Sequence, residues 1–500
     1  MRPSTLLMIS CLAASSRSLS AATAPPATAS PVTAPAIGPE NAAVLVGALR
    51  EAAAQGLGST KFTPSDAATQ LNAPDPALRA QTRDRLAAAV IAYARAQHGG
   101  RMEDRFPADW ALRPAPYDAK ADFQAAMAVG RLSAWVRSLP PADVRYGRLV
   151  QAYARYQEIA AAGGWATVAA KPALKPGAAG DAVEALRARL AVEDPATPAA
   201  AAILAAPSQP APVVVPATSP VPPAASPAPL QPLYGDALTA AVSRAQARYG
   251  LTPDGLAGAS TIAALNVPAA RRVDQIKATL ERWRWAPRSL PAYRVELNIA
   301  DANLALMDGG APDLTMRAIV GKASKPTPSF QDRITAVVLN PPWNVPPDIA
   351  AKEIWPKIRR IPGYMAREGF VVRSGGGLQQ RPGPKCALGA IKFELSNPFG
   401  VYLHDTPSHG LFARDSRTLS HGCMRLERPN DLAKRLLRND PAWPAMRIDM
   451  VIASGKTTRV LLIRPVPVYV VYWTAFVDDQ GQVDFRPDVY RWDEKLLDML

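Results

Sequence analysis

A segment rich in proline and alanine, residues 195–232, most limits what this chain can fold into. Proline has no amide hydrogen to donate and holds a fixed φ angle, and neither residue type offers a large side chain to bury. Such a segment cannot build a packed core, so we interpret it as a loop inserted into a folded module. The folded parts must come from the sequence on either side, and a chain of 500 residues predicts more than one domain.

The sequence before residue 171 indicates an export signal, a linker and a helical domain. Residues 1–22 place a basic residue before apolar and small residues, which is typical of a cleaved signal peptide. Residues 23–40 are rich in proline, alanine and threonine and predict a disordered linker. Residues 41–165 repeat apolar side chains at helical spacing and predict an all-α domain whose aromatic residues serve packing.

Residues 171–268 predict a small three-helix domain that segment 195–232 interrupts. Apolar positions at helical spacing occur on both sides of the interruption, and an Asp-Gly-x-x-Gly turn at 254–258 precedes a short helix. This domain is either a ligand-binding module or a structural bundle without affinity for a ligand. Residues 271–286 form a basic amphipathic pattern, which predicts a helix connecting this domain to the next.

Residues 290–500 predict a mainly β domain. Polar and apolar residues alternate in short runs with turns between them, which favours an antiparallel, sandwich-like arrangement. Residues 347–388 interrupt the alternation with mixed helix and glycine-rich loop, and an insertion of this length predicts a functional lid, which we call the cap. We expect Trp343, Tyr364 and Phe370 to help form the cap. The predicted fold class is α+β and multidomain.

The window 401–426 contains the groups that a thiol active site needs. Three of the four histidines, His404, His409 and His421, lie there beside Cys423, one of three cysteines. A thiol is only slightly ionised at neutral pH unless an imidazole, a positive charge or backbone amides stabilise the thiolate. The window therefore predicts a nucleophilic cysteine, and its spacing leaves open whether His404 or His421 is the base.

Neighbouring residues in the window support this chemistry. If 401–404 is a strand, Tyr402 and His404 share one face. Gly422 lets the backbone turn, so that the amides of Gly422 and Cys423 can face a developing oxyanion. Arg425 can neutralise a thiolate or hold a substrate carboxylate. A zinc site is the alternative for a Cys/His cluster, but ligand spacing such as CxxC or HxxxH is missing, so we predict no metal.

The order His404, then Ser420-His421-Gly422-Cys423, resembles the signature of the L,D-transpeptidases of the YkuD type. Segments at 381–389 and 403–407 resemble their large multidomain Gram-negative branch, and the helical regions are similar to its scaffold and peptidoglycan-binding domains. The resemblance implies that Cys423 is the nucleophile, that His404 is the base and that the backbone carbonyl of Asp405 orients His404. It places Tyr402, Arg425, Ser420, His421 and Trp343 at the substrate site. His421 also shapes the turn, and His409 is a solvated loop residue.

The same resemblance implies a peptidoglycan transpeptidase. Cys423 would attack the donor tetrapeptide stem, release D-alanine and form a thioester, and the amine of a neighbouring stem would then give a 3→3 cross-link. No cofactor is implied, and a carbapenem would leave an adduct on Cys423. Water as acceptor would make the protein an L,D-carboxypeptidase, and a lipoprotein lysine would make it an anchoring ligase.

One residue departs from the pattern of the family. Cys386 stands where the family motif would have asparagine. A disulfide between Cys386 and Cys423 would silence the thiol. The chain would then be a catalytically silent scaffold that binds the cell wall.

Charge and hydropathy agree with a wall substrate. The formal net charge of +15 suits an anionic partner, and peptidoglycan stems carry free carboxylates. Nucleic acid is the generic partner for such charge, but the chain has no nucleic-acid motif and begins with an export signal. No apolar run after the signal is long enough to span a membrane. We expect a periplasmic protein.

Overall fold

A computed structural model describes residues 37–58, 66–102, 105–169, 173–194, 233–478 and 480–500. The predicted signal peptide 1–22, the linker up to residue 36 and the inserted segment 195–232 lie outside the described residues. Within the described ranges, no helix combines the length and the apolar character that a bilayer crossing requires.

The predicted linker extends too far by four positions, residues 37–40. Helix α1 (Pro39–Ala54) begins within it, and Ile37 just before the helix is 7% exposed. Proline at the first helical position has the φ angle of a helix and loses no hydrogen bond there. Ile37 packs with Leu45 and Leu49 in one apolar core, so this stretch belongs to the folded part.

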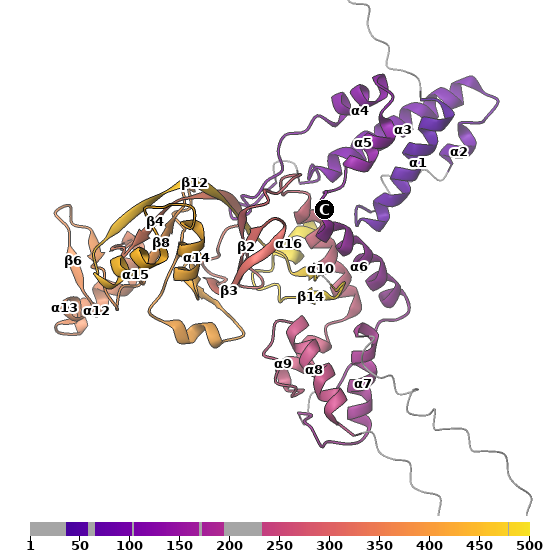
Figure 1. The fold of residues 1–500 in the computed structure, drawn as a ribbon. Coiled ribbons are helices and arrows are strands. Elements are labelled where there is room, and N and C mark those ends of the chain that lie inside the picture. Colours follow the sequence, from indigo (N-terminus) through magenta and orange to yellow (C-terminus); the bar gives the residue numbers. More distant parts are fainter. Residues whose placement is uncertain (1–36, 59–65, 103–104, 170–172, 195–232, 479) are drawn as a thin grey trace, which may run out of the picture. The chain divides into compact units, whose positions relative to one another are not determined.

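The described residues of the predicted helical region form six helices (Figure 1). Asp118 and Asp143 cap the starts of two of them, since each carboxylate accepts hydrogen bonds from backbone amides in the first turn. The helices are α1 (Pro39–Ala54), α2 (Ala67–Gln70), α3 (Pro76–Gln97), α4 (Ala119–Ala128), α5 (Leu132–Ser138) and α6 (Val144–Ala161).

These helices divide between two apolar cores. Helices α1, α3, α4 and α5 enclose the first core, which includes Val90, Tyr93 and Trp135. Helix α6 turns the side chains of Tyr146, Leu149 and Tyr153 into a second core, together with the helices that follow it. Helix α6 makes its most extensive helix contact with α10 (Ala269–Trp283), the predicted connector.

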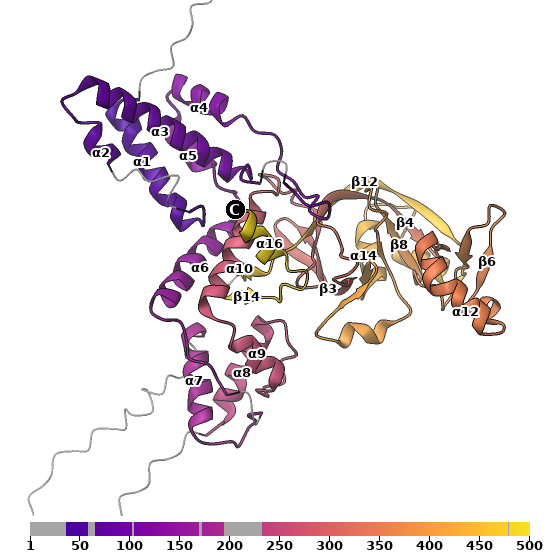
Figure 2. The same cartoon turned by 180° about the vertical axis from the view of Figure 1, so that it is seen from behind.

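The interrupted domain joins across its insertion. It contains α7 (Asp181–Glu193), α8 (Asp236–Arg248) and α9 (Ala259–Leu265), which lie together in Figure 2. Isolated β-bridges pair Leu174 with Ala257 and Ala179 with Leu233, so the segments before and after the insertion are hydrogen-bonded to each other. The Gln246 side chain fixes the predicted turn, because its amide nitrogen donates to Asp254 Oδ1 at 2.7 Å and its oxygen accepts from the Gly255 amide at 2.8 Å.

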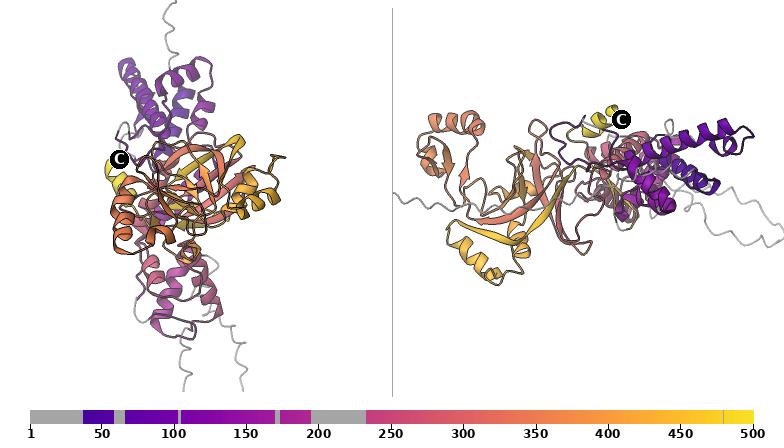
Figure 3. Two further views of the ribbon diagram at one scale, coloured as in Figure 1. Left: turned by 90° about the vertical axis from the view of Figure 1, so that its left-hand side faces the viewer. Right: turned by 90° about the horizontal axis from the view of Figure 1, so that it is seen from above.

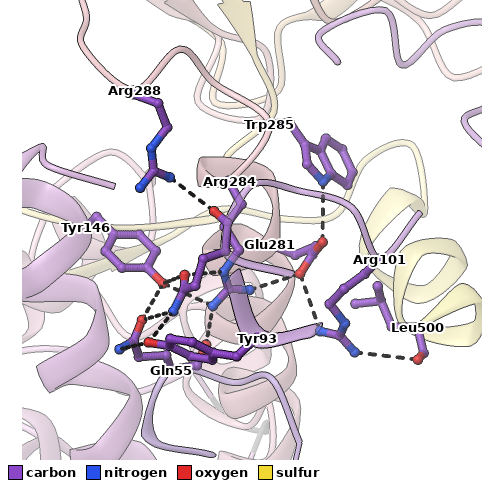
Figure 4. Close-up of polar contacts among 10 residues, drawn as sticks. Gln55, Tyr93, Arg101, Tyr146, Glu281, Arg284, Trp285, Arg288 and Leu500 are labelled. Carbon is purple, nitrogen blue, oxygen red and sulfur yellow. Dashed lines mark hydrogen bonds and ion pairs between the residues drawn. The ribbon is translucent and has the colours of Figure 1, made fainter. Parts of the chain in front are cut away.

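A buried ionic network at the end of α10 joins the helical region to the β domain (Figure 4). The Arg284 guanidinium donates to Glu281 Oε2 at 2.9 Å, to the Tyr146 hydroxyl at 3.0 Å and to the Gln55 carbonyl. Arg284 is 1% exposed, and Glu281 also pairs with Arg101 at 3.3 Å. Because Gln55 directly follows α1 and Tyr146 lies on α6, this one side chain connects both helices to the end of α10.

We expect Arg284→Met to lower the free energy of unfolding by about 3–5 kcal/mol, since removing one partner leaves the Glu281 carboxylate buried with less compensation. Arg271→Met is the matched control on the same helix, because the Arg271–Asp274 pair is 57% and 39% exposed. That control should change stability by less than about 1 kcal/mol. Calorimetric unfolding of both variants measures the difference, and equal effects would contradict a structural role for the network.

The β domain contains one nine-stranded sheet that can be followed in Figures 1 and 3. Strand β2 pairs with both β1 and β3, so the sheet closes on itself around an apolar core that includes Val295, Leu339 and Phe393. The strands are β1 (Arg294–Asn298), β2 (Asn303–Asp308), β3 (Ala311–Gly321), β4 (Phe330–Leu339), β8 (Ile391–Glu394), β9 (Leu403–His404), β10 (Thr418–Ser420), β11 (Met424–Leu426) and β12 (Thr458–Val471). Their order is β10-β3-β11-β9-β8-β4-β12-β1-β2.

The expected antiparallel pairing holds only in part. Strands β1 and β12, β3 and β10, and β9 and β11 pair in parallel. Parallel neighbours need a long connection, and the chain supplies it between β9 and β11 through β10 and the short 3-10 helix η3 (His409–Ala413). The fold class itself is confirmed: helical domains accompany a β-rich domain.

Residues 343–380 form a separate small unit that corresponds to the predicted cap. Its sheet has the order β5-β7-β6, and its own apolar core includes Ile354, Phe370 and Leu378. Trp343 and Tyr364 pack against this core, and the Tyr364 and Phe370 rings stack at 6.1 Å, as the sequence predicted for the cap. Its elements are β5 (Trp343–Asn344), α11 (Pro347–Ile349), the π-helical turn η2 (Ala350–Ile354), α12 (Trp355–Arg360), α13 (Tyr364–Arg367), β6 (Phe370–Val372) and β7 (Leu378–Gln380).

The remaining elements cover the sheet and end the chain. Helix α14 contacts β8, and α15 contacts β4. Strands β13 and β14 form a hairpin whose residues join the second apolar core beside α6 and α10. These elements are α14 (Pro429–Leu436), α15 (Ala445–Ala453), β13 (Ala475–Val477), β14 (Val483–Phe485) and α16 (Trp492–Met499).

Candidate active site

The register of three neighbouring strands assembles the site. His404 on β9 lies opposite Lys392 on β8 and opposite Arg425 on β11. Residues directly opposite each other in a sheet direct their side chains to the same face, and so do residues two apart on one extended strand. Tyr402 and Cys423 stand two positions before His404 and Arg425. All five side chains therefore belong to one face of the sheet.

The Cys423 thiol is partly buried and contacts Tyr402. The Tyr402 side chain lies close enough to the thiol to favour the thiolate, and the Trp343 side chain lies close to the Tyr402 hydroxyl. Burial raises the pKa of Cys423 above its ordinary value, and the opposing effects of Tyr402, Arg425 and Lys392 do not reverse the shift. The thiol is therefore protonated at neutral pH when no substrate is bound.

His404 is buried, neutral and held in one tautomer. It is 4% exposed, and its Nδ1 lies 2.5 Å from the Asp405 carbonyl oxygen. A carbonyl only accepts, so Nδ1 carries the hydrogen and Nε2 has a lone pair available for a proton. Burial, followed by the charge of Arg425, lowers the pKa of His404 to about 3. The carbonyl of Asp405 lies where the sequence comparison placed it, and the ring of His404 is 5.6 Å from the ring of Tyr402.

The Asp405 side chain holds this carbonyl in place. Its carboxylate accepts from the amides of Ala390 and Thr406, each at 2.7 Å. Gly389 packs directly against it at a φ angle of +61°, and a Cβ there would lie 2.3 Å from the carboxylate. Only glycine fits this approach, because a side chain would meet both an unfavourable φ and a steric clash.

Models of known protein families match three parts of the chain. A scaffold domain matches residues 37–152, and a domain described as "Putative peptidoglycan binding domain" matches residues 227–265. The L,D-transpeptidase catalytic domain, YkuD, matches residues 292–452, which contain every strand of the site. Residues 292–452 are an L,D-transpeptidase catalytic domain. The scaffold and peptidoglycan-binding domains accompany it in this chain.

One curated protein and two solved structures are similar to parts of the chain. A protein of Haemophilus influenzae named "Putative L,D-transpeptidase" is 32% identical over 231 residues, which are 42% of this chain and 47% of that protein. The match thus spans about half the length of this relative. The Ldtfm–avibactam carbamoyl enzyme is 13% identical with a TM-score of 0.19, covering 37% of this chain and 50% of that chain. L,D-transpeptidase 3 of Mycobacterium tuberculosis, solved with a faropenem-derived adduct, is 15% identical with a TM-score of 0.20, covering 36% and 60%.

Ser420 and Gly422 hold the turn before the L,D-transpeptidase domain's cysteine. Ser420 is 1% exposed; its hydroxyl donates to the Cys423 carbonyl at 2.6 Å and accepts from the Gly422 amide at 3.1 Å. The Thr327 hydroxyl donates to the Gly422 carbonyl at 2.8 Å. The predicted oxyanion donor Gly422 is therefore already bonded inside the turn, and Ser420 faces the turn rather than a substrate groove.

The other two histidines of the window point elsewhere. His421 Nε2 lies 2.7 Å from Glu353 Oε1 on η2 of the cap, so this side chain ties the cysteine turn to the cap. His409 is 57% exposed and lies 3.5 Å from Asp405 Oδ1. Of the three, His404 shares the sheet face of Cys423. The register of the strands favours His404 over His421, and the role of His404 as base stays a prediction.

The two cysteines in the described residues are both free. Cys386 is 1% exposed, and its sulfur donates to the Pro341 carbonyl at 3.4 Å. Burial raises the pKa of this thiol as well. The predicted disulfide with Cys423 is not formed in this structure, since Cys386 is held in the core by Pro341.

No group of three or more His, Cys, Asp or Glu side chains within the described ranges could hold a metal ion. A cavity of about 500 Å³ between α6, α10 and strands β1–β3 is lined by residues such as Trp283 and Trp473 and includes none of the five side chains of the site.

The sequence analysis did not identify Lys392 as a site residue. Its place in the site follows from the register of β8 against β9, which the sequence alone does not show.

We expect Gly389→Ala to destabilise the protein more than Gly400→Ala. Gly400 has a similar φ of +65° but no atom within 4 Å of an added Cβ, so its variant carries only the backbone cost of about 1–2 kcal/mol. The clash with Asp405 adds to that cost at position 389. Thermal unfolding of the two variants measures the difference, and indistinguishable melting temperatures would contradict the close packing.

We also expect alkylation of Cys423 by iodoacetamide to accelerate steadily from about pH 6 to about pH 9, because a raised thiol pKa places the thiolate at high pH. Mass spectrometry of the peptide that contains Cys423 measures the rate separately from the other cysteines. The urea-unfolded protein gives the profile of an ordinary thiol for comparison. A rate that is already constant from pH 6 upward would mean that the free enzyme holds a thiolate, against this account.

Proposed function

We propose that the protein is a peptidoglycan L,D-transpeptidase that forms 3→3 cross-links between stem peptides. The observation that carries the proposal is the single sheet face that holds a thiol, a neutral imidazole and two cations inside an L,D-transpeptidase catalytic domain. The peptidoglycan-binding and scaffold domains in the same chain support a cell-wall substrate. Such a substrate requires a location outside the cytoplasm, so the periplasm is part of the proposal.

In the acylation step, Cys423 attacks the carbonyl carbon of the diamino acid at position three of a tetrapeptide stem. The free Nε2 of His404 takes the thiol proton as the sulfur–carbon bond forms, and the Tyr402 hydroxyl stabilises the developing negative charge on sulfur. His404 then gives that proton to the leaving amine. D-alanine departs and a thioester remains on Cys423.

The second step reverses the proton path. The side-chain amine of a neighbouring stem attacks the thioester, His404 takes a proton from that amine, and the proton returns to the sulfur as it leaves. The tetrahedral oxyanion of both steps needs amide donors near the carbonyl. The Cys423 amide is one candidate, and the Gly422 amide is the other if its hydrogen bond to Ser420 gives way on binding.

The test is incubation of the full-length protein with purified tetrapeptide stems, followed by mass analysis. We expect the parent protein to form stem dimers that have lost one D-alanine, and Cys423→Ala to form none, because among the described residues no other thiol shares the sheet face of His404. Cys386→Ala is the matched control and should still form dimers.

The products also separate the rival activities. Trimmed tripeptides without dimers would indicate an L,D-carboxypeptidase, and transfer only to a lipoprotein lysine would indicate an anchoring ligase. Unchanged stems with an intact, folded protein would indicate a wall-binding scaffold. Dimers formed equally by Cys423→Ala would contradict the proposed nucleophile.

A further inference from the structure

Two cations beside the Cys423 thiol have no carboxylate partner. Within the described residues, neither Lys392 nor Arg425 takes part in an ion pair, and Arg425 Nε is buried without any hydrogen bond. Glu394, the carboxylate two positions after Lys392 on the same strand, is already paired with Arg459 at 2.7 Å. This carboxylate is therefore not the partner of Lys392.

The two cations stand on either side of His404. Lys392 is its Cα partner on β8, and Arg425 is its Cα partner on β11. Directly opposite residues in neighbouring strands have Cα atoms about 5 Å apart, so both long side chains can reach the space above the imidazole. The Lys392 Nζ lies 4.3 Å from the ring centre of Tyr402, a side chain close to the thiol, so this ammonium is already within the site.

Unpaired, partly buried cations are costly unless a ligand supplies the opposite charge. Burial lowers the pKa of Arg425, and only the Cys423 thiolate, which is not the resting form of this thiol, is identified as opposing that shift. An anionic ligand would remove this cost through charge-assisted hydrogen bonds, and a guanidinium suits a carboxylate especially well. The site therefore has the chemistry of a carboxylate pocket.

We propose that Lys392 and Arg425 together bind the free α-carboxylate of the D-amino acid that leaves the donor stem. This inference rests on the proposed transpeptidase function. The leaving nitrogen must lie near His404 to receive its proton, and the α-carboxylate is attached to the carbon that bears this nitrogen, about 2.5 Å away. It therefore falls between the two cations that flank His404.

Lys392 and Arg425 would make the enzyme selective for donor stems whose last residue is the D-amino acid that leaves. A stem extended by one more residue has an uncharged amide at this position, and the cations would then stay unpaired. Binding the carboxylate would also neutralise the two charges that, after burial, hold the pKa of His404 low. The correct donor would thus make His404 a stronger base at the moment it is needed.

The test compares a tetrapeptide stem with its C-terminal amide as donors for the full-length protein. We expect the parent protein to prefer the free acid by about 10–100-fold in kcat/KM, the range that hydrogen bonds to a charged group provide. In Lys392→Gln and in Arg425→Gln this ratio should fall at least several-fold. Lys434→Gln, which removes a surface cation paired with Asp449, is the matched control and should keep the ratio of the parent.

The ratio is measured within each variant, so a partly unfolded preparation does not imitate the effect. Equal rates on acid and amide by the parent, or an unchanged ratio in both variants, would overturn the inference while leaving the transpeptidase intact. A rate that falls only when the side-chain carboxylate of the diamino acid is amidated would also overturn it. Absence of cross-linking from every donor would count against the proposed function itself.

Discussion

The site depends on the register of three short strands. His404 faces Lys392 across one strand boundary and Arg425 across the other, and a slip by one residue would turn each partner to the opposite side of the sheet. Packing fixes the register at both ends. Asp405 is held against Gly389 just after β9, and the Ser420 hydroxyl fixes the turn just before β11. The reacting groups are therefore placed by backbone pairing rather than by contacts among themselves.

Burial sets the resting state of these groups. It makes the thiol a weaker acid and the imidazole a weaker base, so the pair is neutral before substrate arrives. The positive charges of Arg425 and Lys392 have opposite consequences for the two groups, because they favour the thiolate of Cys423 and disfavour the imidazolium of His404. A substrate that brings negative charge changes this balance. The cap is tied to the same place, since His421 in the cysteine turn lies 2.7 Å from Glu353 of the cap.

The sequence was most informative where the chemistry is local. The window 401–426 held Cys423 and His404, and simple alternation placed Tyr402 and His404 on one face. Features that depend on the pairing of distant strands were missed. Nothing local in the sequence marks Lys392 as a site residue, because its position in the site follows from the pairing of β8 with β9. The parallel pairing of β9 and β11 was missed because no local pattern shows the path of the connection between them. Ser420 was expected at the substrate, but its position in the turn is set by hydrogen bonds to its own neighbours. The helical region was predicted as one domain because periodicity identifies helices but not the core they share.

The most direct measurement of the central claim is the site of a trapped acyl group. The parent protein is mixed with a tetrapeptide stem without an acceptor, quenched in acid within the first turnovers and digested for mass analysis. The account predicts an added tripeptide stem on the peptide that contains Cys423, labile to hydroxylamine as a thioester is. The same mass on another residue, or an equal yield from Cys423→Ala, would contradict it.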